Sequence, residues 1–97
     1  MFDREIIGFI PDDFFDLYLD AGLRRLASAA PYESACHARI ERRGGGYRVL
    51  LGIETGRGAF IGESFGPDLK SAYDLAEEQV VRQLELWRKT RWESEAA

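Results

Sequence analysis

The two side chains with the most reactive chemistry are the only cysteine and the only histidine of the sequence, Cys36 and His37, which are adjacent. A zinc site built from cysteine and histidine needs three or four such ligands, so this pair cannot form one. The pair lies in a segment that alternates like a strand, where neighbouring side chains point to opposite faces, so the two groups cannot act together as nucleophile and base. We expect a buried thiol, a surface imidazole and no metal or other cofactor.

Glycines and paired carboxylates give two weaker indications of a site. The stretch GRGAFIG at residues 56–62 has a suggestive glycine spacing. A phosphate-binding loop leads from a strand into a helix, however, and this stretch leads into a strand. The acid pairs Asp12–Asp13 and Glu77–Glu78 fall at a helix start and on a helix surface, where capping and solvation explain them. No enzyme signature remains.

Arginine and lysine side chains gather in two places where they could contact phosphate. The first group comprises Arg39, Arg43 and Arg48, with Arg57 at a nearby loop. The second group comprises Arg82, Arg88, Lys89 and Arg91. Cations clustered on one face of a domain are typical of nucleic-acid contacts. A solvated sheet face also explains the first group, and the helix dipole, which favours cations near a helix end, also explains the second.

The overall balance of charge restricts how such a surface could work. The chain has 97 residues, with 13 Lys and Arg residues against 17 Asp and Glu residues and a net charge of -4. Nonspecific binding to nucleic acid depends on the neutralisation of phosphates by cations, so any RNA site must be local. At this length we expect one domain with its own core.

The start of the sequence indicates neither export nor a membrane. Asp3, Arg4 and Glu5 occupy the place where a signal peptide needs apolar residues, and a lone cysteine makes no internal disulfide. The longest uncharged stretch, residues 26–32, has 7 residues. A membrane-spanning helix needs about 20 apolar residues. We therefore expect a protein of the cytoplasm that does not bind a membrane.

The first third of the chain predicts a strand and a helix. Residues 5–10 form a short apolar run that ends before Pro11, which is typical of a strand. Asp12 or Asp13 can cap the following helix, which should end near Ala30. Apolar residues recur there at spacings of three and four, as a helix with one buried face requires. They are Phe15, Leu19, Gly22, Leu23 and Leu26.

The middle of the chain predicts three strands. Apolar and polar residues alternate from Cys36 to Arg43, and the alternation resumes from Tyr47 to Ile53. Three glycines at residues 44–46 favour a tight turn between them, so the two strands should pair as a hairpin. A second turn at residues 55–58 precedes the third strand, which covers residues 59–65.

The last third predicts one long helix that begins after Asp68. An apolar stripe continues along it for about five turns, as a helix packed on a sheet requires. The stripe consists of Leu69, Ala72, Tyr73, Ala76, Val80, Leu84 and Trp87. Glu78 and Arg82, like Glu85 and Lys89, stand four apart in the order that favours ion pairs on the solvent face.

The expected order of elements is strand, helix, strand, strand, strand, helix. Hairpin-joined, mostly antiparallel strands with two helices packed on one face make a two-layer α+β domain. We expect this single domain to cover residues 1–92. A frayed tail should follow at residues 93–97, where neither a cap nor a helical period continues.

Residues 60–89, FIGESFGPDLKSAYDLAEEQVVRQLELWRK, resemble the carboxyl-terminal strand and helix of a known family. This is the family of hibernation-promoting factor and ribosome-associated inhibitor A, also called ribosomal subunit interface proteins. The matching residues are Gly66 and Asp68 in a turn, Ala72, Tyr73 and Asp74 at the helix start, and Val80, Gln83 and Leu84 in its second half. The segment GLRRL at residues 22–26 is similar to the end of the family's first helix.

The resemblance implies a β-α-β-β-β-α fold related to double-stranded RNA-binding domains. Members of that family are not enzymes; they bind the small ribosomal subunit in the channel for messenger and transfer RNA and silence translation under stress. Basic residues of their two helices make most of the contacts with ribosomal RNA. The RNA-binding residues implied here are Arg82, Arg88 and Lys89, with Arg24, Arg25 and Arg39. The family usually has Lys at the position of Gln79 and a basic residue at that of Leu86.

Two other functions fit parts of the sequence. The acidic balance and the two missing helix cations favour a protein-interaction or self-associating domain that kept the fold and lost the RNA surface. Such a domain would be a homodimer or bind a protein partner, and Trp92 or Phe14, which fall outside the core stripes, are its candidate contacts. A stand-alone double-stranded RNA binder would need a basic start to the last helix, where only Lys70 is present.

Overall fold

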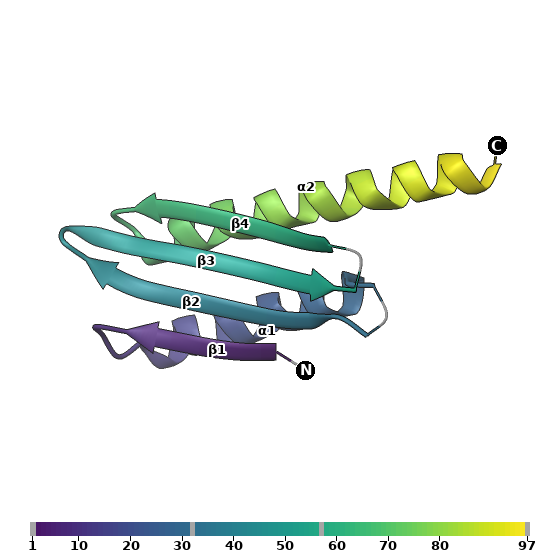
Figure 1. The fold of residues 1–97 in the computed structure, drawn as a ribbon. Helices are drawn as coiled ribbons and strands as arrows, with labels where there is room; N and C mark the ends of the chain where they lie inside the picture. The colour runs from purple at the N-terminus through teal and green to yellow at the C-terminus, as the bar shows by residue number, and fades with distance from the viewer. Residues whose placement is uncertain (1, 32, 57, 97) are drawn as a thin grey trace.

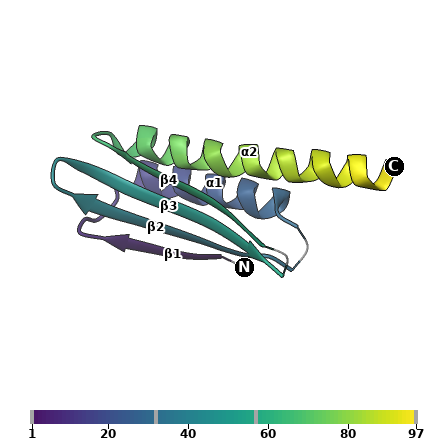
Figure 2. The same ribbon diagram turned by 45° about the horizontal axis from the view of Figure 1, so that its top comes forward.

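A four-stranded sheet carries two helices on one of its faces (Figures 1 and 2). The computed structural model describes residues 2–31, 33–56 and 58–96, with the side chains of residues 3–90 among them. The elements in chain order are β1 (Phe2–Ile7), α1 (Asp13–Ala29), β2 (Ala35–Arg43), β3 (Gly46–Thr55), β4 (Gly58–Gly66) and α2 (Leu69–Ala96). This order and layering confirm the predicted two-layer α+β fold.

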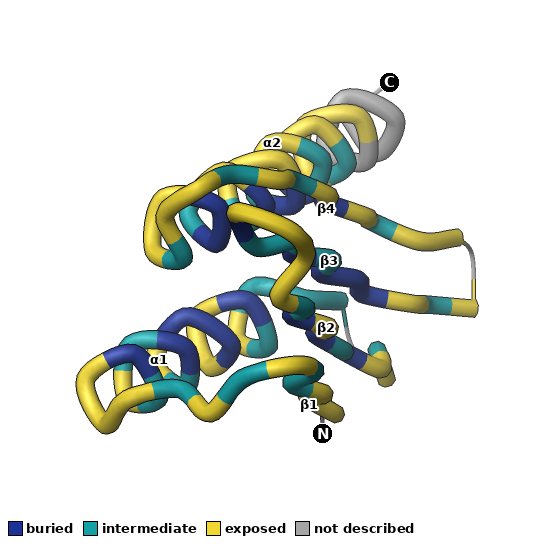
Figure 3. Tube along the Cα trace, turned by 90° about the vertical axis from the view of Figure 1, so that its left-hand side faces the viewer, coloured by how far each residue is buried: buried dark blue, intermediate teal, exposed yellow. Residues whose placement is uncertain are grey.

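The strands lie in the sheet in the order in which they occur in the chain, β1-β2-β3-β4. The two hairpins make β2, β3 and β4 antiparallel, whereas β1 runs parallel to β2 because α1 crosses over between them. Alternation places one set of side chains against the helices and leaves the opposite face of the sheet, here called the open face, without a covering layer (Figure 3). The buried set includes Cys36, Ala38 and Ile40 of β2 and Val49, Leu51 and Ile53 of β3.

The first strand lies earlier than predicted, at Phe2–Ile7 rather than at residues 5–10. Gly8 has a φ of 86°, a left-handed conformation that ends an extended strand. Ile10 is 95% exposed, so the apolar run continues beyond the sheet into the connection that leads to α1. The pattern of apolar residues in the sequence does not distinguish a strand residue from an exposed loop residue.

Both helices begin at the predicted aspartates. The Asp12 carboxylate accepts a hydrogen bond of 2.7 Å from the backbone N–H of Phe15. The Asp68 carboxylate accepts one of 3.0 Å from the backbone N–H of Ser71 and one of 2.7 Å from the Ser71 hydroxyl. These hydrogen bonds favour the charged carboxylate and so lower the pKa of Asp68. Each aspartate thus satisfies a backbone donor that the first turn of its helix leaves free.

The last helix continues through Ala96, so residues 93–96 of the expected frayed tail are helical. Ala97 lies outside the described residues, as do the side chains of residues 91–96, including Trp92. The C-terminal part of α2 extends past the end of the sheet (Figures 1 and 2).

Tyr73 of α2 is fully buried where the two helices meet over the sheet. Its ring makes edge-to-face contacts with Phe15 and Tyr18 of α1, at centroid distances of 6.4 and 5.8 Å. Its hydroxyl lies against the backbone of Gly22, where an added Cβ would be 2.1 Å from the oxygen. Burial, with the Glu77 carboxylate as a smaller cause, raises the pKa of the Tyr73 phenol.

Two glutamines of α2 cover the outer edge of β4. The Gln79 side chain accepts a hydrogen bond from Glu63 N–H and donates one to Glu63 C=O, both at 2.9 Å. Gln83 does the same for Ile61, at 2.9 Å from the N–H and 2.6 Å to the C=O. The helix comes this close because Gly62 has no Cβ, which would lie 2.1 Å from the backbone oxygen of Ala76. The two amides therefore occupy backbone groups that an edge strand otherwise presents to other chains.

We expect Gly22→Ala to destabilise the protein, although alanine is favoured over glycine in a helix by about 1 kcal/mol. The new methyl group would collide with the Tyr73 hydroxyl, and overpacking of this kind costs about 1–3 kcal/mol. Urea unfolding measures the change. Tyr73→Phe removes the hydroxyl, the nearest of the struck atoms, but leaves Tyr73 Cζ at 2.8 Å and Glu77 Oε2 at 2.9 Å, so the double variant should recover part of the loss. A more stable Gly22→Ala protein would contradict the packing described here.

We expect Gln79→Ala to lower the free energy of unfolding by about 1 kcal/mol, because two hydrogen bonds to β4 are lost. The Gln79→Ala, Gln83→Ala double variant should also self-associate as its concentration rises, since the β4 edge becomes free to pair. Urea unfolding and analytical ultracentrifugation measure the two effects. Glu85→Ala, on the exposed side of the same helix, is the matched control and should change neither. A double variant that stays monomeric would show that the glutamines do not guard this edge.

Candidate nucleic-acid interface

The two-layer fold separates the six predicted RNA-binding residues onto two surfaces. Five of them belong to the helices, namely Arg24 and Arg25 of α1 and Arg82, Arg88 and Lys89 of α2. Arg39 is in β2 at a position that alternates with the buried residues Ala38 and Ile40, so it lies on the open face. No single flat surface can contact all six, because the sheet lies between the two groups.

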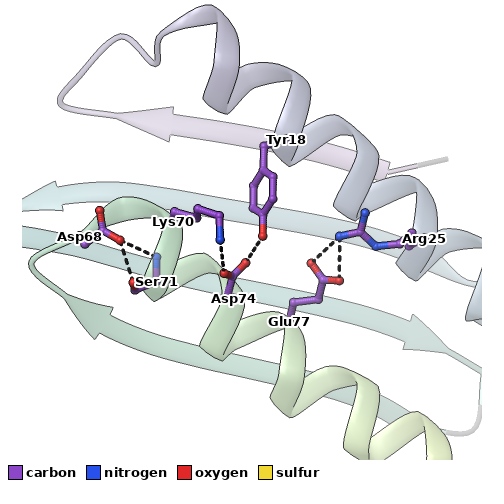
Figure 4. A network of polar contacts seen from close by, with 7 residues as sticks. All are labelled: Tyr18, Arg25, Asp68, Lys70, Ser71, Asp74 and Glu77. Carbon is purple, nitrogen blue, oxygen red and sulfur yellow. Dashed lines mark hydrogen bonds and ion pairs between the residues drawn. The ribbon is translucent and has the colours of Figure 1, made fainter.

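A polar seam of side chains joins the two helices (Figure 4). It consists of Tyr18 and Arg25 of α1 and Lys70, Asp74 and Glu77 of α2. The Tyr18 hydroxyl of α1 donates a hydrogen bond to the Asp74 carboxylate of α2, and the Lys70 ammonium donates to the same carboxylate at 3.0 Å. That ammonium also lies 5.0 Å from the centroid of the Tyr18 ring. The hydrogen bond to Asp74 raises the pKa of Tyr18, with burial as a smaller cause, and the same carboxylate raises the pKa of Lys70.

Arg25 belongs to this seam, since its guanidinium lies 3.2 Å from the Glu77 carboxylate of α2. The attraction of that carboxylate raises the pKa of Arg25. Arg25 is one of the implied RNA-binding residues, and its acidic partner is 52 positions away in the chain. Only the packing of α1 against α2 brings the two charges together.

Two more of the predicted cations have acidic partners on their own helices. Arg24 lies 3.1 Å from Asp20 in α1. Arg82 pairs with Glu78 in α2, which confirms the predicted i, i+4 pair. These side chains are exposed, and surface pairs of this kind contribute about 0–1 kcal/mol. The acidic partners of Arg24 and Arg82 thus offset their positive charge, but these exposed pairs do not fix the positions of the two side chains.

Arg88 and Lys89 retain their positive charge without an acidic partner among the residues that the structure describes. The Arg88 guanidinium donates a hydrogen bond of 2.6 Å to the carbonyl of Ala29, the last residue of α1. A cation at this end of a helix interacts favourably with the helix dipole. Lys89 is exposed, and the predicted pair with Glu85 is absent from the ion pairs of residues 3–90. Within the described part of the helices, the cations without an acidic partner therefore lie where α2 passes the end of α1.

Gln79 and Leu86, the residues at the positions where the family usually has a cation, differ in what they do in the structure. Gln79 holds the β4 edge, as described above, so an amide at this position has a function in the fold that a lysine could not perform in the same way. Leu86 is 65% exposed on α2, and no contact in the structure explains why it replaces a basic residue.

The open face of the sheet has its own group of arginines. Arg39 and Arg43 of β2 and Arg48 of β3 line a pocket of about 190 Å³ together with Glu41 and Leu50. This confirms that the first arginine group of the sequence shares one face. Arg57, which was grouped with them, lies outside the described residues.

The cysteine and histidine behave as separate groups. Cys36 is buried under the helices, where burial raises the pKa of its thiol, whereas the ring of His37 lies on the open face against the backbone of Gly52. No cluster of three potential metal ligands occurs within the described part of the chain. None of the helices, as far as they are described, is both long and apolar enough to cross a membrane.

Apolar side chains are exposed at the start of α1 and just before it. Phe14 is 70% and Leu17 72% exposed, and Ile10 precedes them. We call these three residues the apolar patch. Asp13 in the same helical turn is exposed as well. Clusters of exposed apolar residues with polar neighbours are typical of protein contacts.

Comparison with known proteins finds no matching family model and no matching curated protein. Two solved structures share the fold. The N-terminal domain of Protein Y from Thermus thermophilus has a TM-score of 0.70 and 20% identity, covering 87% of this chain and 94% of that one. A ribosomal subunit interface protein from Coxiella burnetii has a TM-score of 0.72 and 13% identity, covering 92% of this chain and 99% of that one. The chain therefore has the fold that these two proteins share, as its resemblance to the family of hibernation-promoting factor and ribosomal subunit interface proteins predicts.

Proposed function

We propose that the protein is a ribosome-associated binding factor without catalytic activity that acts in the cytoplasm. In this proposal it occupies the decoding channel of the small ribosomal subunit and silences translation under stress. The observation that carries the proposal is the fold shared over 92% of the chain with a protein described as a ribosomal subunit interface protein. Fold alone does not determine function, so the proposal also needs a surface of the helices that can bind RNA.

The RNA contact in this proposal is the surface around Arg88 and Lys89. These cations have no acidic partner among the described residues, and they stand on the part of α2 that approaches the end of α1. A local cluster of this kind can contact phosphate although the chain as a whole is acidic, since charges on other faces are screened beyond about 8 Å at physiological salt. The acidic side chains around Asp13 and Asp16 lie at the opposite end of α1.

Arg24, Arg25 and Arg82 can join this surface by exchanging partners. Their ion pairs with Asp20, Glu77 and Glu78 are partly or fully exposed, so each contributes little to stability. A guanidinium can form two parallel hydrogen bonds to a phosphate, which makes RNA a strong competitor for it. The three acidic partners would then lower the affinity for RNA that makes only a single contact with the protein. Their effect would be smaller in an enclosed channel, where RNA contacts several cations at once.

A protein-interaction domain is the second candidate function, and the apolar patch is the observation that favours it. Ile10, Phe14 and Leu17 expose apolar surface on the side of α1 that no other element of the described structure covers. Asp13 beside them would select a partner with basic residues. This candidate predicts that Phe14→Ser abolishes binding of the partner and leaves affinity for ribosomes unchanged.

Co-sedimentation with small ribosomal subunits through sucrose, at low and raised salt, tests the main proposal. Wild-type protein should be retained at low salt and released as salt rises, since phosphate contacts depend on counterion release. Lys89→Glu should weaken retention about fivefold or more and lower the salt slope by about one, because one phosphate contact is lost. Arg82→Glu should act in the same direction. The thermal midpoint of each variant should stay within a few degrees of the wild type.

Arg42→Glu is the matched control, because it makes the same change of charge on an exposed residue of the sheet layer. It should retain most of the affinity for small subunits. Absence of the wild-type protein from the subunit fraction at low salt would refute the proposed function. Equal loss in Lys89→Glu and Arg42→Glu would refute the assignment of the surface while leaving ribosome binding intact.

A further inference from the structure

Arg39 is the predicted RNA-binding residue that the fold separates from the others, and it lines a pocket on the open face. The pocket has a volume of about 190 Å³ and lies over β2 and β3. Pockets for whole cofactors or drug-sized ligands are about 300–1,000 Å³. The volume of this pocket lies below that range, so the pocket suits one small group.

The register of the strands explains why three arginines meet in this pocket. Arg48 of β3 stands directly opposite Glu41 of β2, and Leu50 stands opposite Arg39. Arg39 and Arg43 flank Glu41 on the same face of β2, each two residues away, which is about 6.6 Å along a strand. The side chains of Arg39 and Arg43 can therefore reach towards one point above Glu41 and Leu50, and Arg48 borders that point from β3.

The charges of the pocket leave cationic capacity unused. Arg48 donates two hydrogen bonds to the Glu63 carboxylate of β4, at 3.0 Å from Nε and 2.7 Å from Nη2. Arg43 is only loosely paired with Glu41, at 3.9 Å. Arg39 has no ion pair with any residue whose side chain the structure describes. The pocket is thus lined by three guanidinium groups and the Glu41 carboxylate. The Glu63 carboxylate lies beside Arg48, and Glu5 of β1 stands opposite Arg39 in the sheet.

We propose that this pocket binds a phosphate group, with Arg39 as its main ligand and Arg43 and Arg48 as its flanks. The planar guanidinium matches the geometry of phosphate oxygens with two parallel hydrogen bonds. Arg48 keeps its contact with Glu63 and contributes to the site through its remaining N–H groups. The Glu41 carboxylate repels the phosphate group and so lowers the affinity of the pocket for it. The site lies across the sheet from the surface around Arg88 and Lys89 and does not depend on the function proposed for it.

Titration of the labelled protein with inorganic phosphate, followed by NMR at constant ionic strength with chloride as the balancing anion, tests the site. Saturable shifts should be confined to the side-chain Nε–H signals of Arg39, Arg43 and Arg48 and to the nearby backbone of β2 and β3. Shifts without saturation, or shifts spread equally over both helices, would overturn the proposal.

Three single substitutions distinguish specific phosphate binding in this pocket from nonspecific electrostatic attraction of phosphate to the protein. Arg39→Gln should weaken phosphate binding about two- to fivefold, as expected for one exposed charged contact. Glu41→Gln, which keeps the size of the side chain, should strengthen it by a similar factor. Arg42→Gln is the matched control, one residue from Glu41 on the same strand and with its side chain on the other face, and it should have no effect. Equal weakening by Arg39→Gln and Arg42→Gln would overturn the site, as would weaker binding by Glu41→Gln.

A second titration, with a short single-stranded oligoribonucleotide, identifies the source of the phosphate. Tighter binding of the oligonucleotide than of inorganic phosphate, with the same sensitivity to Arg39→Gln, would support the site and assign it to RNA. Binding of inorganic phosphate alone would support the site and assign it to a small phosphorylated molecule. Neither titration involves ribosomes, so failure here would leave the proposed function standing, and failure of co-sedimentation would leave this site standing.

Discussion

The burial of Tyr73 between α1 and α2 is the interaction on which the arrangement of the protein depends. A tyrosine of this size can be fully buried at a helix crossing only if the opposing helix has no side chain at the point of contact, and Gly22 meets that condition. The contact fixes the distance between the helices. That distance in turn allows Tyr18 to reach Asp74 and Arg25 to reach Glu77, so the polar seam follows from the packing of one ring.

A similar close approach on the other side of α2 determines how the sheet ends. Gly62 lets the helix lie against β4, and Gln79 and Gln83 then replace the neighbouring strand that β4 lacks. The amide of glutamine has one donor and one acceptor side, so it can bond to both the N–H and the C=O of one strand residue. A lysine has only donors. A glutamine at position 79 can therefore bond to the β4 edge where a lysine could not, and the helix surface has no cation at this position.

The distribution of paired and unpaired charge connects the fold with the proposed function. Among the described side chains of the helices, Arg24, Arg25, Lys70 and Arg82 each have an acidic partner. Among the residues whose side chains the structure describes, Arg88 and Lys89 have no acidic partner at one end of the layer, and Arg39 has none on the opposite side of the sheet. In the two proposals the phosphate-binding groups lie on two faces of the domain, and each is tested by its own substitution.

Sequence patterns alone predicted the order of the elements, a cap at Asp12 or Asp13, the cap at Asp68 and nearly all of the core, because periodicity and capping are local properties of the chain. They misplaced β1, since an apolar run does not reveal that Gly8 turns out of the sheet. They also could not tell which cations are free. The partners of Arg25 and Arg88 are 52 and 59 positions away, and the separation of Arg39 from the helix cations arises only when the sheet forms. Contacts between residues far apart in the chain depend on how the layers pack, and only the tertiary structure decides that.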